Sequence, residues 1–160
     1  MKPTVYIETT VISYLTSKPS RDLIVAAHQQ ITHEWWGKML PSYQPYISPV
    51  VLEEISRGDA QEAEQRIQKV ATFPLLEVSA EVNELAKYYS SKLSIPEKAI
   101  ADLFHLALAT WHGMDFLASW NCKHIVNGRV KQVLEKVNKL RGLDTPIICT
   151  PEELMEVEDV

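Results

Sequence analysis

The sequence has few of the residues that hold disulfide-rich or zinc-bound domains together. It contains only two cysteines, Cys122 and Cys149, and neither belongs to a CxxC pair. We therefore expect no disulfide framework and no cysteine-based zinc site, and the free thiols indicate a reducing compartment. Glycine occurs only five times, without a glycine-rich phosphate loop or a GxSxG nucleophile turn. Nucleotide-loop and serine-hydrolase chemistry are not expected.

Long apolar runs and an excess of positive charge are also missing. No stretch approaches the length of about 18 apolar residues that suggests a transmembrane helix. Glu8 interrupts the first apolar segment, which argues against a signal peptide. We expect a cytoplasmic protein without a membrane span. The 16 basic and 21 acidic side chains give a net charge of -5, which argues against a basic DNA-coating protein. A local basic surface or a bound cation would still allow contact with nucleic acid.

What remains is the composition of an ordinary globular domain. Hydrophobic residues make up 46% of the 160 positions and charged residues 23%. A chain of this length buries a core without help from disulfides or metals. No internal repeat or long linker is visible. We predict a single domain over residues 1–155 and an acidic tail over 156–160.

The spacing of apolar residues alternates between strand and helix periods. Short β-branched and aromatic runs predict strands over residues 4–7, 45–48, 75–78, 116–119 and 147–149. Helical spacing between them predicts helices over 9–15, 20–40, 49–57, 60–71, 79–93, 99–111 and 126–141. Strands separated by helices favour right-handed crossovers and a parallel sheet. The predicted fold is a three-layer α/β/α domain with a mostly parallel sheet of about five strands.

Polar residues occur where such a sheet binds ligands, beyond the carboxyl ends of its strands. Glu8 ends the first predicted strand, Glu54 lies in the helix after the second, and Asn121 follows the fourth. Asp102 is the only charged residue in the apolar helix over 99–111. A carboxylate in such a helix costs on the order of several kcal/mol unless it is paired, hydrogen-bonded or bound to metal. Oxygen ligands at one edge are what Mg²⁺ or Mn²⁺ requires.

Each of these residues also has a simpler interpretation. Glu8 would accept the N–H groups of the following helix. Glu54 would belong to a solvated helix face, Asp102 would bond to a helix cap or an arginine, and Asn121 would be a turn residue. His105, three residues after Asp102, is most simply a satisfied core histidine, with a supporting or general-base role as the alternative.

Four segments that contain these residues resemble the PIN domain, a nuclease fold that includes the VapC-like toxin ribonucleases. The similar segments are residues 5–14, 47–55, 101–109 and 116–121, and they occur in the family's order and at its spacing. The resemblance implies a PIN-like three-layer fold and places the family's catalytic, metal-binding positions on Glu8, Glu54, Asp102 and Asn121. Its accompanying hydroxyl positions fall on Thr10 and Ser119. We assign Glu54 rather than Glu53 because Glu54 precedes the apolar Ile55.

Two positions depart from the family's pattern. Glu8 stands where aspartate is usual, and its longer side chain shifts the carboxylate relative to a metal that demands regular geometry. Asn121 stands where aspartate is frequent and offers only one uncharged carbonyl oxygen. The resemblance implies Mg²⁺ or Mn²⁺ as cofactor and an endoribonuclease that hydrolyses RNA phosphodiester bonds. It also implies the toxin of a type II toxin–antitoxin pair, with an antitoxin partner and a homodimer.

A basic stretch follows the fourth predicted strand and supplies candidate RNA contacts at Lys123, Arg129 and Lys131. The simpler interpretation is the solvated face of an amphipathic helix. Two other functions stay open. One is a catalytically weak PIN-like module that binds RNA or a protein partner, and the other is a generic α/β domain whose acids are unrelated.

Overall fold

The sheet has four parallel strands in the order β2-β1-β3-β4. The computed structural model describes residues 1–156, so most of the acidic tail predicted over 156–160 lies outside the described residues. The strands are β1 Thr4–Ile7, β2 Gln44–Tyr46, β3 Phe116–Ala118 and β4 Ile147–Cys149. Ile7 pairs with Ala118, so the carboxyl ends of β1 and β3 meet side by side. This juxtaposition places Glu8 next to Ser119.

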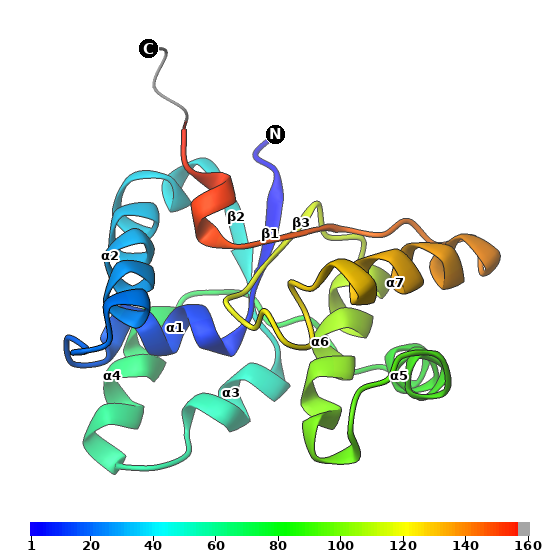
Figure 1. Cartoon of the computed structure of the whole chain (residues 1–160), viewed down its shortest axis with the longest axis horizontal. Coiled ribbons are helices and arrows are strands. Elements are labelled where there is room, and N and C mark those ends of the chain that lie inside the picture. Colours follow the sequence, from blue (N-terminus) through cyan, green and yellow to red (C-terminus); the bar gives the residue numbers. More distant parts are fainter. Residues whose placement is uncertain (157–160) are drawn as a thin grey trace.

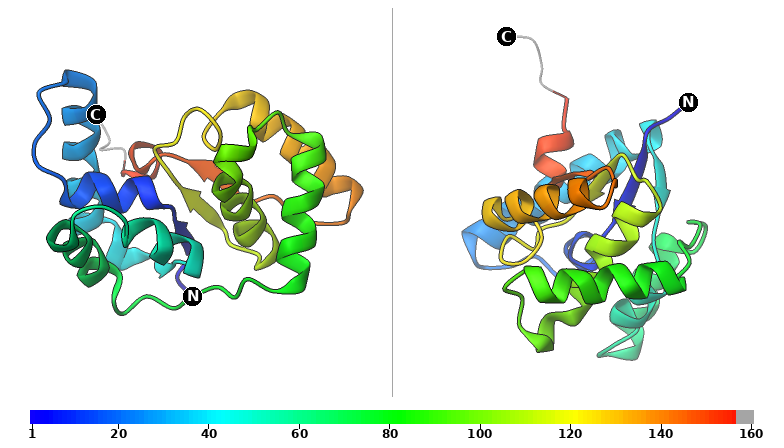
Figure 2. Two further views of the ribbon diagram at one scale, coloured as in Figure 1. Left: turned by 90° about the horizontal axis from the view of Figure 1, so that it is seen from below. Right: turned by 90° about the vertical axis from the view of Figure 1, so that its right-hand side faces the viewer.

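The helices form two groups, with α1 to α4 on one side of the sheet and α5 to α7 on the other (Figures 1 and 2). This arrangement agrees with the predicted three-layer fold. Short 3-10 turns cover residues 40–42, 97–99 and 151–154. Within residues 1–156, no helix has both the length and the apolar character needed to cross a membrane. The helices are α1 Thr9–Thr16, α2 Leu23–Lys38, α3 Pro49–Ile55, α4 Ala60–Val70, α5 Ala80–Lys92, α6 Ile100–Trp111 and α7 Gly128–Leu140.

The strand predicted over 75–78 is wrong, which reduces the sheet from about five strands to four. This segment makes only an isolated bridge between Leu75 and Ile47. Its backbone bonds join Ile47 N to Pro74 O at 3.1 Å and Leu76 N to Ile47 O at 2.8 Å. Pairing stops there because the chain turns into α3 at Ser48, whose side chain caps that helix. The neighbouring edge strand is therefore too short to extend the ladder.

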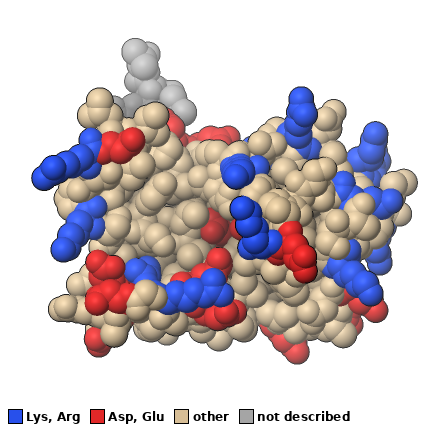
Figure 3. Space-filling view, turned by 60° about the horizontal axis from the view of Figure 1, so that its bottom comes forward, with Lys and Arg blue, Asp and Glu red and all other residues tan. Residues whose placement is uncertain are grey.

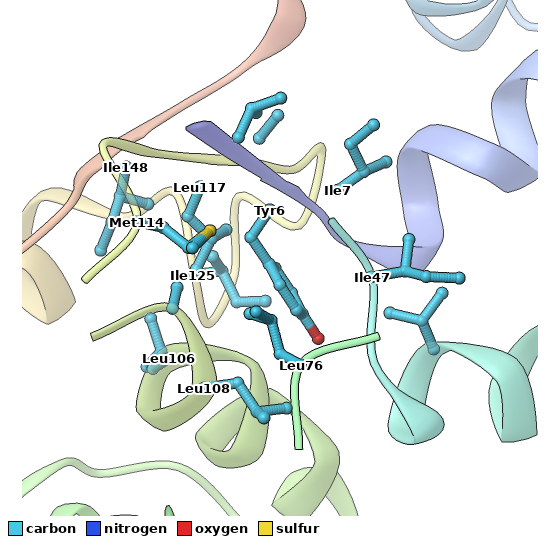
Figure 4. Close-up of a cluster of buried hydrophobic side chains, with 14 of the residues drawn as sticks. Tyr6, Ile7, Ile47, Leu76, Leu106, Leu108, Met114, Leu117, Ile125 and Ile148 are labelled. Atoms are coloured by element: carbon cyan, nitrogen blue, oxygen red, sulfur yellow. The ribbon is translucent and has the colours of Figure 1, made fainter. Parts of the chain in front are cut away.

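Helix α6 lies against the sheet and is buried over most of its length, as its apolar composition predicts. Its buried residues include Leu106 and Leu108, which face the side chain of Tyr6 from β1 (Figure 4). Tyr6 is wholly buried and directs its hydroxyl group away from the sheet. The central strand and the buried helix therefore bring polar groups together inside the core, next to the carboxyl edge of the sheet.

Candidate active site

Glu8 lies between β1 and α1 with only 2% of its surface exposed. Its Oε2 accepts a hydrogen bond from the Thr10 backbone N–H at 3.1 Å. Its Oε1 accepts bonds from the hydroxyls of Thr10 at 2.6 Å and Ser119 at 2.5 Å. Glu8 therefore caps α1, as the simpler interpretation predicts. The hydroxyls that the family resemblance assigned to the first and fourth segments, those of Thr10 and Ser119, thus both contact the Glu8 carboxylate.

The start of α1 and the loop after β3 are joined to each other around this carboxylate. The Trp120 N–H donates to the Thr10 hydroxyl at 2.8 Å, and the Asn121 N–H donates to the Ser119 hydroxyl at 2.9 Å. Ser119 is itself tied to β4, because its N–H donates to the Cys149 carbonyl at 3.0 Å. The position of the Glu8 carboxylate is thus set by both strand ends.

Glu54 points inward from α3, and its neighbour Glu53 points outward. The Glu54 Oε1 accepts a bond from the Thr9 hydroxyl at 2.7 Å and lies 2.6 Å from the Nε2 of His105. Glu53 instead pairs with the exposed Arg57 at 2.7 Å. The structure therefore distinguishes the two glutamates, with Glu54 directed toward the sheet edge and Glu53 toward solvent.

His105 is wholly buried on α6 and links Glu54 to the core. Its Nδ1 lies 2.6 Å from the Tyr6 hydroxyl, which lies 2.8 Å from the Ser48 hydroxyl. Ser48 also accepts the Val51 N–H at 3.3 Å at the start of α3. The orientation of the His105 ring is therefore fixed by groups on both β1 and the loop before α3.

Glu8, Glu54 and His105 converge at one point. One ligand atom from each of the three side chains lies within 4.8 Å of the other two. No other group of three acidic, histidine or cysteine side chains within residues 1–156 comes this close. The two glutamates were predicted to meet at this edge, whereas His105 was expected mainly to fill the core.

Asp102 and Asn121 form a second arrangement, joined through His124. The Asp102 Oδ2 lies 2.9 Å from the His124 Nδ1, and the Asn121 Oδ1 accepts the His124 N–H at 3.0 Å. The backbone carbonyl of Asn121 accepts hydrogen bonds from the N–H groups of Ile125 and Val126, so Asn121 also stabilises a turn. Asp102 thus bonds to a histidine, not to the helix cap or arginine of the simpler interpretation.

The pKa values of the three converging groups are shifted in different directions. Burial raises the pKa of Glu8, although the charge of His105 and the three hydrogen bonds oppose it. Burial would also raise the pKa of Glu54, but the bond and charge of His105 and the Thr9 hydroxyl lower it overall. Burial would lower the pKa of His105, yet the bond to Glu54 and the charges of Glu8, Glu54 and Asp102 raise it. The raised pKa of His105 and the lowered pKa of Glu54 thus reflect their mutual attraction, and the charge of Asp102 also raises the pKa of His105.

Several contacting residues had little signal in the sequence. Tyr6 and Ser48 fell within the strands predicted over 4–7 and 45–48, and Thr9 began the helix predicted over 9–15. The one available signal for His105 was its position three residues after Asp102, which places it on a neighbouring part of the same helical face. His124 was visible only in a Cys-Lys-His segment without further ligands at zinc spacing.

A basic cavity lies next to the Asp102–His124 pair. It has a volume of about 320 Å³ and is lined by His124 together with Lys92, Lys123 and Arg129. Two of the three predicted RNA contacts therefore line one cavity. Lys131 lines a separate cavity with Glu135 and Ile147. In Figure 3, basic side chains gather over the right-hand part of the molecule, and acidic atoms are visible near the centre of the same face.

No family model and no curated protein sequence matches the chain. Among solved structures, it is similar to a chain of VapBC2 from Rickettsia felis bound to a DNA fragment from their promoter. The TM-score is 0.57 at 12% sequence identity, and the similarity covers 92% of this chain and 98% of that chain. The fold is PIN-like. The fold expected from the four sequence segments is thereby confirmed. At this level of identity the likeness concerns the fold alone, and the roles of the side chains rest on their geometry.

Proposed function

We propose that this chain is a metal-dependent endoribonuclease and the toxin of a type II toxin–antitoxin pair, acting in the cytoplasm. One observation carries the proposal, namely the convergence of Glu8 and Glu54 at the carboxyl edge of a PIN-like sheet. Glu8 is buried, and within residues 1–156 no lysine or arginine forms an ion pair with it. A buried carboxylate without a permanent cation favours a bound cation, so the residues present fit Mg²⁺ or Mn²⁺.

Glu8 and Glu54 would hold the ion, and the hydroxyls around them would keep both carboxylates in place. When bound, the ion supplies Lewis acidity for phosphodiester hydrolysis. Thr10 and Ser119 orient Glu8, and Thr9 orients Glu54. Asp102 and Asn121 belong to the proposed site through the family resemblance, and Asp102 takes part once its carboxylate is released from His124. No protein side chain is proposed as a covalent nucleophile.

RNA would reach this edge along the basic cavity beside His124. Lys92, Lys123 and Arg129 line that cavity and would bind backbone phosphates, which makes binding sensitive to salt. The VapBC2 structure contains a promoter DNA fragment, and its fold likeness to this chain supports an antitoxin partner. We also propose a homodimer on the basis of the family resemblance. Co-expression with the product of the adjacent gene should relieve growth arrest if that product is the antitoxin.

The decisive test compares Glu54→Gln with the matched variant Glu53→Gln. Purified proteins are incubated with a long single-stranded RNA in EDTA, Mg²⁺ or Mn²⁺, and cleavage is followed on denaturing gels. We expect metal-dependent cleavage, and we expect Glu54→Gln to lower its rate by at least roughly tenfold. Loss of a residue that only supports a metal ligand already lowers metal affinity or activity about 10–100-fold, and Glu54 is proposed as a ligand itself. Glu53→Gln should behave like the wild type because Glu53 pairs with Arg57 at the surface. Absence of cleavage in both metals, or equal cleavage by both variants, would refute the nuclease assignment.

A second candidate is the catalytically weak module that binds RNA or a protein partner. One observation favours it, because Glu54 and Asp102 are each bonded to a histidine at 2.6 Å and 2.9 Å. Carboxylates that are already paired have less to gain from a metal. Fluorescence anisotropy with labelled RNA separates the two functions. Binding without cleavage in either metal supports the module, and binding with cleavage supports the enzyme.

A further inference from the structure

His105 lies where Glu8 and Glu54 converge, beyond its role as a partner of Glu54. Its Nε2 lies 2.6 Å from the Glu54 carboxylate and belongs to the set of ligand atoms that lie within 4.8 Å of one another. Ligands of an octahedral ion lie about 2.1 Å from it, so neighbouring ligands are about 3 Å apart and opposite ones about 4.2 Å apart. The three side chains are therefore close enough to share one ion if the 2.6 Å contact widens to about 3 Å.

The second nitrogen of His105 has the kind of partner that orients a metal-bound histidine. Such histidines normally use the other ring nitrogen to bond a neighbouring group, which fixes the ring and the tautomer. In this chain the Nδ1 lies 2.6 Å from the Tyr6 hydroxyl, which is held in turn by Ser48 at 2.8 Å. All three side chains are wholly buried. The ring cannot turn away without breaking this chain of bonds, so the Nε2 stays directed at the two carboxylates.

We propose that the Nε2 of His105 is a third ligand beside Glu8 and Glu54, so that this site selects a first-row transition-metal ion over Mg²⁺. Mg²⁺ prefers oxygen ligands, whereas imidazole nitrogen suits transition metals, whose affinities rise from Mn²⁺ through Co²⁺. A purely oxygen site made of the predicted residues Glu8, Glu54, Asp102 and Asn121 would discriminate less strongly. The inference rests on the proposed function only in that the same two glutamates hold the ion, and it does not require catalysis.

The test is calorimetric titration of the metal-free protein with Mg²⁺, Mn²⁺ and Co²⁺, each alone. We expect Mn²⁺ and Co²⁺ to bind at least about tenfold more tightly than Mg²⁺. His105→Gln should lower the Mn²⁺ and Co²⁺ affinities by at least about tenfold and leave the Mg²⁺ affinity nearly unchanged. The control is His112→Gln, at the end of the same helix, where one ring nitrogen bonds the Glu77 carbonyl at 2.8 Å. That variant should leave all three affinities as in the wild type.

Tyr6→Phe provides a second, milder variant in case His105→Gln does not fold. It keeps the histidine and removes only the hydroxyl that orients the ring. It should weaken Mn²⁺ and Co²⁺ binding several-fold without affecting Mg²⁺. Equal affinity of the wild type for Mg²⁺ and Mn²⁺, or an equal loss of both in the variants, overturns the proposal. A wild type that binds none of the three ions also overturns it.

Failure of this inference is distinguishable from failure of the nuclease assignment. RNA cleavage that persists with equal use of Mg²⁺ and Mn²⁺ refutes the nitrogen ligand and keeps the enzyme. Selective Mn²⁺ and Co²⁺ binding without RNA cleavage keeps the metal site and refutes the enzyme.

Discussion

Removal of the Tyr6 hydroxyl should measurably destabilise the protein. In Tyr6→Phe, the His105 Nδ1 loses the hydroxyl that lies 2.6 Å away, and Ser48 loses one at 2.8 Å. Ser48 keeps the bond from the Val51 N–H, so His105 carries most of the loss. His105 has no exposed surface through which water would replace the missing partner. An unsatisfied buried polar group costs about 1–3 kcal/mol, which is the expected fall in the free energy of unfolding.

Urea unfolding and differential scanning calorimetry provide the measurement. For a chain of this size, about 1 kcal/mol corresponds to roughly 2–4 °C in the melting temperature, so Tyr6→Phe should lower it by about 2–12 °C. The urea midpoint should fall with little change in the slope, since the same surface is exposed on unfolding. Tyr46→Phe on β2 is the matched control, because the Tyr46 hydroxyl has no hydrogen-bond partner within residues 1–156. Its effect should stay within about 0.5 kcal/mol.

A double-mutant cycle shows whether the bonds act as one network. Ser48→Ala breaks the same series of hydrogen bonds at its other end, where Ser48 contacts Tyr6. It also removes the side-chain cap of α3, a loss that by itself costs about 1 kcal/mol. Contacting residues in a shared network show interaction energies of about 0.5–3 kcal/mol in such a cycle. If Tyr6→Phe destabilises no more than Tyr46→Phe, or if its effect simply adds to that of Ser48→Ala, then the fixed orientation of His105 is refuted.

Three further predictions concern pH, the Glu8 carboxylate and RNA. The pKa of His105 is raised in the folded state, so its contribution to stability is complete below about pH 6.5 and is lost as the pH rises through the folded value. Urea titrations of the metal-free protein should therefore show a fall in stability over that rise in pH. The profile of His105→Gln should be flatter. Ser119→Ala removes a bond to the buried Glu8 and should lower the free energy of unfolding at pH 7 by about 1.5–3 kcal/mol in urea melts. Lys123→Ala should weaken RNA binding for all sequences and lower the slope of log affinity against log salt by about 1, measured by anisotropy.

The fold was largely predictable because its signals are local. The helices predicted over 49–57, 60–71 and 79–93 are present, and the side chains of Ser48, Asp59 and Ser79 cap them by accepting a backbone N–H. The strand over 75–78 failed for a non-local reason. Its composition suits a strand, but pairing requires a neighbour of equal length, and β2 ends at Tyr46. The composition of a segment indicates its own strand propensity, but it does not indicate how long the neighbouring strand is.

The candidate site was predictable only where the fold alone determines position. The rule for strand ends located Glu8 correctly at the sheet edge, because any parallel sheet places it there. The contact between Glu54 and His105 depends on how α3 and α6 pack, and helical spacing specifies only the face of a residue. The bond between Asp102 and His124 depends on a loop of irregular backbone after β3. The positions of these residues in the sequence therefore predict neither of the two contacts.

The Glu54–His105 pair would let such a site remain stable without a bound ion and still accept one. Carboxylates gathered at a buried edge repel each other and lose hydration, so they require a positive partner. Lysine or arginine would provide a permanent charge that a metal cannot displace. Histidine is different, because it gives up its proton near neutral pH and its nitrogen is then a ligand itself. Glu54 has such a partner, because the His105 Nε2 lies 2.6 Å from its carboxylate, so a proton and a metal ion would compete there. We therefore expect metal affinity, measured by calorimetric titration, to rise as the pH rises through the raised pKa of His105, because the ring must lose its proton to bind the ion.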